Sequence, residues 1–252
     1  MTNEKIKKEI LQTFYAFWTG GNLSSSYQVD EHDDRIRYLT GIPLAIFNGI
    51  IRAKHPTEEI INATIDYFRK IHLPFLWWQE PGTHVENWMH ERGFHDMGPF
   101  VAVGGDISAM AICNNQLYTV RPVQTSKEFE TWYDLIDEGF AVPPDCKLKY
   151  KEWLLNYGPK LIHYNAYKNH KPVGTVSLQL GSIGGIWNLT VLEKHRNKGV
   201  GTALIQHCLK ECLLRDIVSC MAMLMPDRQA ESLFNKLGMP SLFEMTGYCF
   251  VP

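Results

Sequence analysis

The chain has 252 residues and a formal net charge of −2 at pH 7, so no broad basic field points to a nucleic acid partner. The apolar fraction of 45% is ordinary for a globular protein, and no apolar run approaches the ~20 residues that a membrane helix needs. The polar start, Met1 to Lys5, contains no signal-peptide core, and we expect a cytoplasmic protein that binds no membrane. At this length, one large or two small domains are possible.

The first half alternates strand-like and helix-like segments. We expect two strands, a helix, a buried strand, a helix and a last strand at residues 37–41, 44–51, 60–71, 74–78, 83–92 and 100–103. Thr57 is a plausible N-cap for the first of these helices. A short polar break then runs from Cys113 to Gln116, before a strand restarts at residues 117–122. We therefore expect two domains, residues 1–113 and 117–252.

The second half continues with a similar alternation. We expect helices at 125–140 and 144–157, strands at 161–167, 172–178 and 186–191, a helix at 202–214, a buried strand at 218–224, a helix within 227–239 and a last strand that carries Tyr248. The strands at 172–178 and 186–191 form a hairpin that leads into a glycine-containing turn.

This turn, Arg196-Asn197-Lys198-Gly199-Val200-Gly201-Thr202, is predicted to hold phosphate. Glycine lets the backbone approach a ligand closely, and the first turn of a helix offers N–H groups without internal partners and a dipole that favours an anion. Arg196 and Lys198 add positive charge. The turn lacks the Gly-Lys-Ser/Thr end of a Walker A loop and the third Gly of the dinucleotide fingerprint.

The turn resembles the acyl-CoA turn of the GNAT superfamily of N-acetyltransferases, Gln/Arg-x-x-Gly-x-Gly/Ala, with Arg196, Gly199 and Gly201 in its three defining places. Residues 227–239 resemble the family's second helix, Asn-x-x-Ala-x-x-Leu-Tyr-x-Lys-x-Gly-Phe. The resemblance covers about residues 118–252. It implies the α/β (α+β) GNAT fold, the acyl-CoA N-acyltransferase fold, with a mixed, mostly antiparallel central sheet flanked by helices.

The resemblance also implies acetyl-CoA (coenzyme A) as cosubstrate. In the family, the turn holds the pyrophosphate, and the strand before it pairs with the pantetheine arm and polarises the thioester carbonyl through a backbone N–H. Carried over to this chain, the residues implied to bind acetyl-CoA are Leu189, Thr190, Val191, Arg196, Asn197, Lys198, Gly199, Val200, Gly201, Thr202, Asp227 and Phe234.

The base that deprotonates the amine is less clear from the sequence. Many relatives place a Glu on the strand before the turn, whereas this strand offers Asn188 and Thr190, neither of which is a base. Asn188 could instead order a water that relays the proton. Other candidates, each more simply read as structural or surface residues, are Glu193, His163 and Tyr164.

The general acid also departs from the family pattern. Many relatives carry a Tyr where this chain has Phe234, which cannot donate a proton. Either the thiol leaves unaided, since its pKa near 8.5 makes it a tolerable leaving group, or Tyr248 on the last predicted strand takes over.

The first half resembles a degenerate copy of the second, as in tandem GNAT proteins. Its elements follow the same order, and residues 89–94 echo residues 234–239. Where the turn should stand, residues 51–57 contain no Gly-x-Gly, and Pro56 has no N–H to give. We expect this half to bind no CoA and to shape the acceptor pocket or a dimer contact.

The six cysteines contain no Cys-x-x-Cys pair. His207, Cys208 and Cys212 could suggest a metal site, but Val200, Leu204, Cys208 and Cys212 repeat every four residues, which is typical of the apolar stripe of a helix. We therefore expect no metal.

The predicted function is N-acetyl transfer from acetyl-CoA to a primary amine of a small molecule or peptide, by direct attack in a ternary complex. The alternative is a non-catalytic acyl-CoA-binding or sensing protein, and an adaptor with two degenerate copies is a third reading. The acceptor and the choice between monomer and homodimer are open from the sequence.

Overall fold

The computed structural model describes residues 3–20, 27–112, 117–158, 160–226 and 229–252. The first half contains α1 (Asn3–Thr19), β1 (Gln28–Glu31), β2 (Ile36–Leu39), β3 (Asn48–Ile51), α2 (Glu58–Lys70), β4 (Phe75–Gln79), α3 (Glu86–Glu91) and β5 (His95–Asp106). The second half contains β6 (Thr119–Pro122), α4 (Ser126–Phe140), α5 (Lys147–Leu155), β7 (Leu161–Lys168), β8 (Lys171–Gln179), β9 (Gly184–Val191), α6 (Val200–Leu213), β10 (Ser219–Leu224), α7 (Glu231–Lys236) and β11 (Ser241–Phe250). Across these ranges, no helix combines the length and apolar character needed to cross a membrane.

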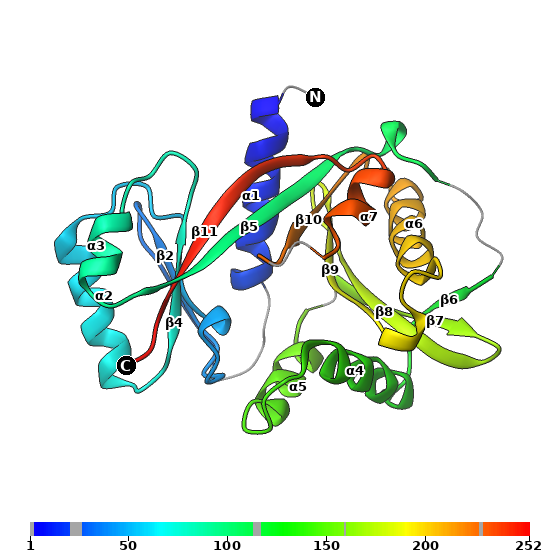
Figure 1. Cartoon of the computed structure of the whole chain (residues 1–252), viewed down its shortest axis with the longest axis horizontal. Coiled ribbons are helices and arrows are strands. Elements are labelled where there is room, and N and C mark those ends of the chain that lie inside the picture. Colours follow the sequence, from blue (N-terminus) through cyan, green and yellow to red (C-terminus); the bar gives the residue numbers. More distant parts are fainter. Residues whose placement is uncertain (1–2, 21–26, 113–116, 159, 227–228) are drawn as a thin grey trace.

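All of these strands join one 11-stranded sheet, in the order β1-β2-β3-β4-β11-β5-β10-β9-β8-β7-β6 (Figure 1). Neighbouring strands are antiparallel except β3–β4 and β9–β10, which are parallel. The chain therefore has the mixed, mostly antiparallel sheet flanked by helices that the sequence predicts.

Alternate residues along the strands join different hydrophobic clusters. On β4, Trp78 belongs to a cluster with α1, α4 and α5, whereas Trp77 belongs to a cluster with α2 and α3. On β9, Trp187 belongs to the first of these clusters, and Ile186 joins a third cluster with α6 and α7. Because successive side chains of a strand point to opposite faces, α1, α4 and α5 cover one face of the sheet, and α2, α3, α6 and α7 cover the other.

The last strand of each half lies in the sheet beside the other half. β5, which ends the first half, pairs with β10, and β11, which ends the second half, pairs with β4. β5 and β11 also pair with each other at the centre of the sheet (Figure 1). The boundary expected at residues 113–117 thus separates two segments that exchange their last strands, and residues 113–116 themselves lie outside the described ranges.

The helix starts follow the capping residues of the sequence. Thr57 Oγ1 accepts a hydrogen bond from the backbone N–H of Ile60 at 3.3 Å, which confirms the predicted N-cap of α2. Thr125 and Glu128 form a reciprocal capping box at the start of α4.

Two predicted boundaries are wrong. The strand expected at residues 44–51 begins only at Asn48, because residues 45–47 form a 3₁₀ turn that the Asn48 side chain holds by donating to the carbonyls of Ile42 and Leu44. The helix expected at residues 83–92 begins at Glu86, because Thr83 is held in a turn by hydrogen bonds with Gln79 and Glu80. The long helix α1 was not predicted at all.

Candidate functional site

The parallel strands β9 and β10 part from each other on the side where the predicted turn lies. They pair only through Gly184–Cys220, Gly185–Met221 and Ile186–Ala222. β9 stays paired with β8 as far as Val191, and β10 stays paired with β5 as far as Leu224. Beyond Ile186, the backbone groups of β9 that face β10 therefore have no strand partner within the described residues.

The turn leads from β9 into α6. Asn197 and Gly199 have φ angles of 57° and 83°, in the left-handed region that Asn and Gly tolerate best. The N–H of Arg196 donates to Glu193, and the next backbone N–H with a backbone acceptor is that of Ala203, which donates to the Gly199 carbonyl at 3.0 Å. In the described part of the chain, the N–H groups of residues 197–202 thus have no backbone acceptor. Such a run at a helix start is suited to an anion.

Positive side chains surround these N–H groups. Arg196 is held at the end of β9, where its Nε donates to the Val191 carbonyl at 3.2 Å. The pKa of His195 is lowered, first by loss of hydration and then by the positive charges of Lys194, Lys198 and Lys168. Several cations therefore converge on the turn, and they favour a bound anion there.

Two contacts from outside hold the turn in place. The buried Tyr118, just before β6, donates its hydroxyl to the Lys198 carbonyl at 2.6 Å. A Cβ at Gly201 would lie 2.8 Å from Cδ2 of Leu233, so α7 packs directly on the start of α6. Any side chain at position 201 would therefore displace the end of the Leu233 side chain, a contact that the sequence pattern alone did not indicate.

The strand before the turn carries a β-bulge at Asn188. Thr175 of β8 pairs with Thr190, and Ser177 pairs with Trp187, so β9 has one residue more than β8 over this stretch. Asn188 has a φ of 52°, and its Nδ2 donates to the Ser177 hydroxyl at 3.3 Å. The structure thus brings Asn188 together with the Leu189–Val191 segment and the turn.

The remaining predicted residues are placed differently. Phe234 is buried among the residues of α6 and α7, and Asp227 lies outside the described residues. Of the other base candidates, Tyr164 points to the α6 face, where its hydroxyl donates to Glu211 at 3.3 Å. Glu193 lies exposed in the 3₁₀ turn at residues 193–195.

The structure does not bring Tyr248 to the turn. Tyr248 pairs with Trp77 on β4 and Asp96 on β5, and it packs in the cluster of α2 and α3. β11 runs to the C-terminus on the opposite side of the molecule from α6 (Figure 1). This placement gives no support to the expectation that Tyr248 donates a proton to the leaving thiolate.

The matching place in the first half is closed by its own side chains. β3 and β4 pair only through Gly49–Leu76 and Ile50–Trp77. Just past β4, the Glu80 carboxylate accepts a hydrogen bond from the Tyr15 hydroxyl of α1, at 2.5 Å. Burial is the main cause that raises the pKa of Glu80.

The start of α2 is also unsuited to an anion. The side chain of Thr57 already caps the helix, and Glu58 and Glu59 occupy its first turn. These carboxylates would repel a phosphate at the place that corresponds to the turn of the second half.

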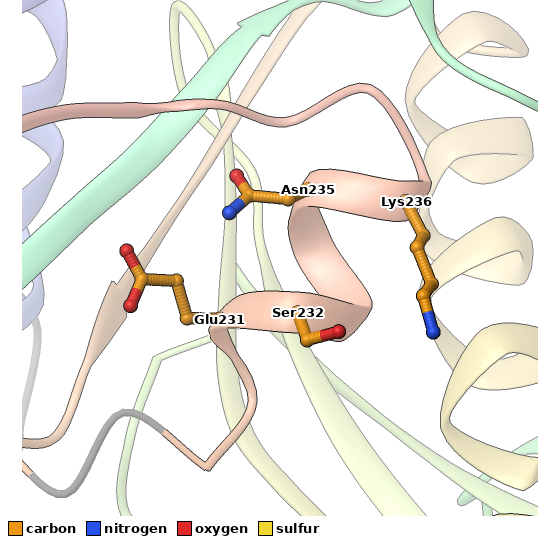
Figure 2. Close-up of a pocket in the computed structure, with 4 residues that line it drawn as sticks. All are labelled: Glu231, Ser232, Asn235 and Lys236. Carbon is orange, nitrogen blue, oxygen red and sulfur yellow. The ribbon is translucent and has the colours of Figure 1, made fainter.

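An open hollow of about 600 Å³ lies on the outer side of α7, lined by Glu231, Ser232, Asn235 and Lys236 (Figure 2). Figure 2 shows Glu231 and Asn235 on one flank of α7, with Ser232 and Lys236 on the other. None of the four belongs to the turn, and Leu233, which meets Gly201, does not line this hollow. We therefore locate the site at the turn and the bulge.

The partly buried His163 of β7 makes a testable contribution to stability. Burial lowers its pKa from 6.5 to about 4, so the unfolded chain takes up a proton first as the pH falls. The stabilisation is complete above pH 6.5 and is lost progressively as the pH falls from 6.5 to about 4, by roughly 3 kcal/mol in all at about 1.4 kcal/mol per pH unit. Urea unfolding of the parent and of His163→Asn from pH 7.5 to 4 is expected to show a shallower loss in the variant.

The control for this measurement is His84→Asn, because the side chain of His84 is 87% exposed. We expect this variant to follow the parent at every pH. Parallel curves for the parent and His163→Asn would contradict the burial argument.

Comparisons with known proteins agree with this fold. Residues 128–239, which include the bulge and the turn, match the model of the acetyltransferase (GNAT) family. This match marks a GNAT acetyltransferase domain at residues 128–239. No curated protein matches the chain in sequence.

Several solved structures share the fold over nearly the whole chain. A GCN5-related N-acetyltransferase from Kribbella flavida superposes with a TM-score of 0.69 and 12% identity, over 97% of this chain and 95% of that one. A conserved protein from Staphylococcus epidermidis ATCC 12228, described as functionally unknown, superposes with a TM-score of 0.74 and 16% identity, over 94% of this chain and 97% of that one. A tandem GNAT protein from the clavulanic acid biosynthesis pathway superposes with a TM-score of 0.59 and 10% identity, over 96% of this chain and 95% of that one.

Proposed function

We propose that this protein is an N-acetyltransferase that transfers an acetyl group from acetyl-CoA to a primary amine of a small molecule or peptide, by direct attack in a ternary complex. The observation that carries the proposal is the run of N–H groups at residues 197–202 without backbone acceptors, beside the point where β9 parts from β10. The match of this segment to an acetyltransferase family supports it.

The residues of the turn fit the charge of the cosubstrate. The free N–H groups, Arg196 and Lys198 would hold the pyrophosphate, each charge-assisted hydrogen bond being worth roughly 1.5–3 kcal/mol. The backbone groups of Leu189, Thr190 and Val191 that face away from β8 would bind the pantetheine arm as a neighbouring strand does. When bound, acetyl-CoA supplies an acetyl group that is already activated as a thioester.

We assign proton handling to the bulge and to solvent. An amine must lose a proton as its nitrogen bonds to the acetyl carbon and the carbon–sulfur bond breaks. The Asn188 side chain would order a water that carries this proton away. Because Phe234 has no hydroxyl, we propose that the sulfur leaves without a protein acid, which its pKa near 8.5 permits.

The first half would serve the acceptor side and bind no CoA. The absence of CoA binding is supported by Glu80, which fills the place in the first half that corresponds to the turn. Glu58 and Glu59 support it as well, because they add negative charge at the start of α2. The role on the acceptor side is supported by α1, whose Phe17 stacks on Trp187 of β9 with ring centroids 3.9 Å apart. The first half thus contributes a helix that rests on the strand before the turn.

A non-catalytic acyl-CoA-binding protein is the second candidate. It is favoured by Phe234 at the place of the family's acid and by the absence of a carboxylate from β9, whose polar side chains are Asn188 and Thr190.

The test is thermal melting with acetyl-CoA, followed by thiol release with a panel of amines. Ligand at 100 times its Kd adds roughly 2.7 kcal/mol, which for a chain of this size raises Tm by roughly 5–10 °C. A rise together with thiol release on at least one amine supports the enzyme. A rise without release on any amine favours the binding protein, and no rise contradicts both.

A further inference from the structure

A chain of polar side chains crosses three neighbouring strands beneath α4. Asn188 Nδ2 of β9 lies 3.3 Å from the Ser177 hydroxyl of β8, and this hydroxyl lies 2.9 Å from Nδ1 of His163 on β7. His163 and Ser177 face each other in the register of β7 and β8, and Ser177 stands opposite Trp187, next to the bulge. The chain therefore ends at the residue that gives β9 its irregular course.

The bulge needs such support because Asn188 has a positive φ. A left-handed conformation is unfavourable for an L residue, although Asn tolerates it better than most. The hydrogen bond to Ser177 holds the Asn188 side chain and backbone in one conformation. In this conformation, the segment after Asn188 departs from the regular β8–β9 pairing.

His163 is fixed at the far end of the chain. Its ring lies 4.0 Å from that of Trp132 on α4 by centroids, and Phe129 adds a second ring contact at 5.9 Å. With a pKa lowered to about 4 it stays neutral near pH 7, so Nδ1 can accept a hydrogen bond. The Ser177 hydroxyl, which accepts from Asn188, has its one proton available to donate to His163.

We propose that Ser177 and His163 are positioning residues for acyl transfer: they hold Asn188 in the bulge and so aim the N–H groups of the Leu189–Val191 segment at the thioester carbonyl. The inference rests on the proposed function for its catalytic consequence. Its structural part, that Ser177 fixes the bulge, is testable on the free protein.

The first experiment is amide hydrogen exchange of residues 188–190 in the free protein. Ser177→Ala removes only the shared hydroxyl, and exchange is expected to become at least about 10-fold faster because the bulge opens more readily. The matched control is Thr175→Val, which removes an equally buried hydroxyl two residues away, bonded to the Tyr164 carbonyl at 2.8 Å. Thr175→Val should exchange like the parent at these residues. Equal exchange in the parent and Ser177→Ala overturns the proposal whether or not the protein is an enzyme.

The second experiment separates positioning from general structural damage. In Ser177→Ala, kcat is expected to fall about 10- to 100-fold, the scale of a misplaced reacting geometry. The Kd of CoA is expected to rise by a much smaller factor, because CoA has no acetyl carbonyl and the turn that we assign to its pyrophosphate is unchanged. His163→Asn keeps a hydrogen-bonding group near the place of Nδ1 and should retain most of kcat, whereas His163→Leu should behave like Ser177→Ala. Equal losses of kcat and CoA affinity, or equal activity of the two His163 variants, overturn the proposal. A parent that transfers no acetyl group refutes the proposed function instead, and the exchange result still decides the role of Ser177.

Discussion

Residues 117–252 expressed alone are expected not to fold, and the same fragment co-expressed with residues 1–112 is expected to bind acetyl-CoA. Without the first half, β10 loses the antiparallel partner β5, and β11 loses its partners on both sides, β4 and β5. Each lost strand leaves unpaired backbone groups and exposes an apolar face, and both favour aggregation. Cutting the chain within residues 113–116 removes none of these pairings, so the two fragments should assemble.

The comparison needs the single fragment, the co-expressed pair and the intact chain in one melting series. We expect a cooperative transition, and a rise in Tm with acetyl-CoA, only for the pair and the intact chain. A monomeric, folded fragment 117–252 with the acetyl-CoA affinity and acceptor activity of the intact chain would refute both the need for exchanged strands and the acceptor role of the first half.

Gly201→Glu is expected to weaken the binding of CoA at least about 100-fold, because it places a carboxylate among the N–H groups that we assign to the pyrophosphate. Losing one or two charge-assisted hydrogen bonds, at roughly 1.5–3 kcal/mol each, accounts for this magnitude. A side chain at this position also meets Leu233, since even a Cβ would lie 2.8 Å from its Cδ2. Part of any loss is therefore steric.

Gly201→Gln separates the two causes. It has nearly the same shape and meets Leu233 in the same way, but it carries no charge. We expect the Glu variant to bind CoA at least about 10-fold more weakly than the Gln variant by calorimetry, with a difference that shrinks as the ionic strength rises. Equal affinities of the two variants would show that no anion binds at this turn.

The parts of the fold that the sequence predicted are those with local signals. Thr57 begins a helix because its side chain satisfies a free N–H group, and this is visible in a few residues. The turn at Gly199 and Gly201 can also be recognised from the sequence, because its glycines and basic residues are adjacent in the chain. The order of strands and helices from β2 to β5 and from β6 to β11 followed from the same local signals, whereas α1 and β1 were not predicted.

The missed parts depend on contacts between distant residues. α1 has a broad mixture of polar and aromatic residues, and it is fixed by partners such as Glu80, which bonds to Tyr15, and Trp187, which stacks on Phe17. No pattern within α1 indicates either partner.

Within the site, Asn188 was singled out, but its partner Ser177 was not. A signal existed, because Thr175 and Ser177 alternate with the apolar Val176 and Leu178 in a part of the strand that is buried from Val173 to Gln179. Polar side chains on the buried face of a strand require partners. The identity of those partners, Asn188 and His163, depended on the register of three strands and on a bulge, which the sequence does not specify.

The exchanged strands also determine when a newly made chain can fold. Gln79 of β4 pairs with Thr246 of β11, which is synthesised long after it. At about 5–20 residues per second, the first half waits roughly 10–30 s for this partner. During that time the apolar edge of β4, with Trp77 and Trp78, is without its neighbour. Production of this protein should therefore depend on chaperones that hold nascent chains, although its finished sheet has β4 in its interior.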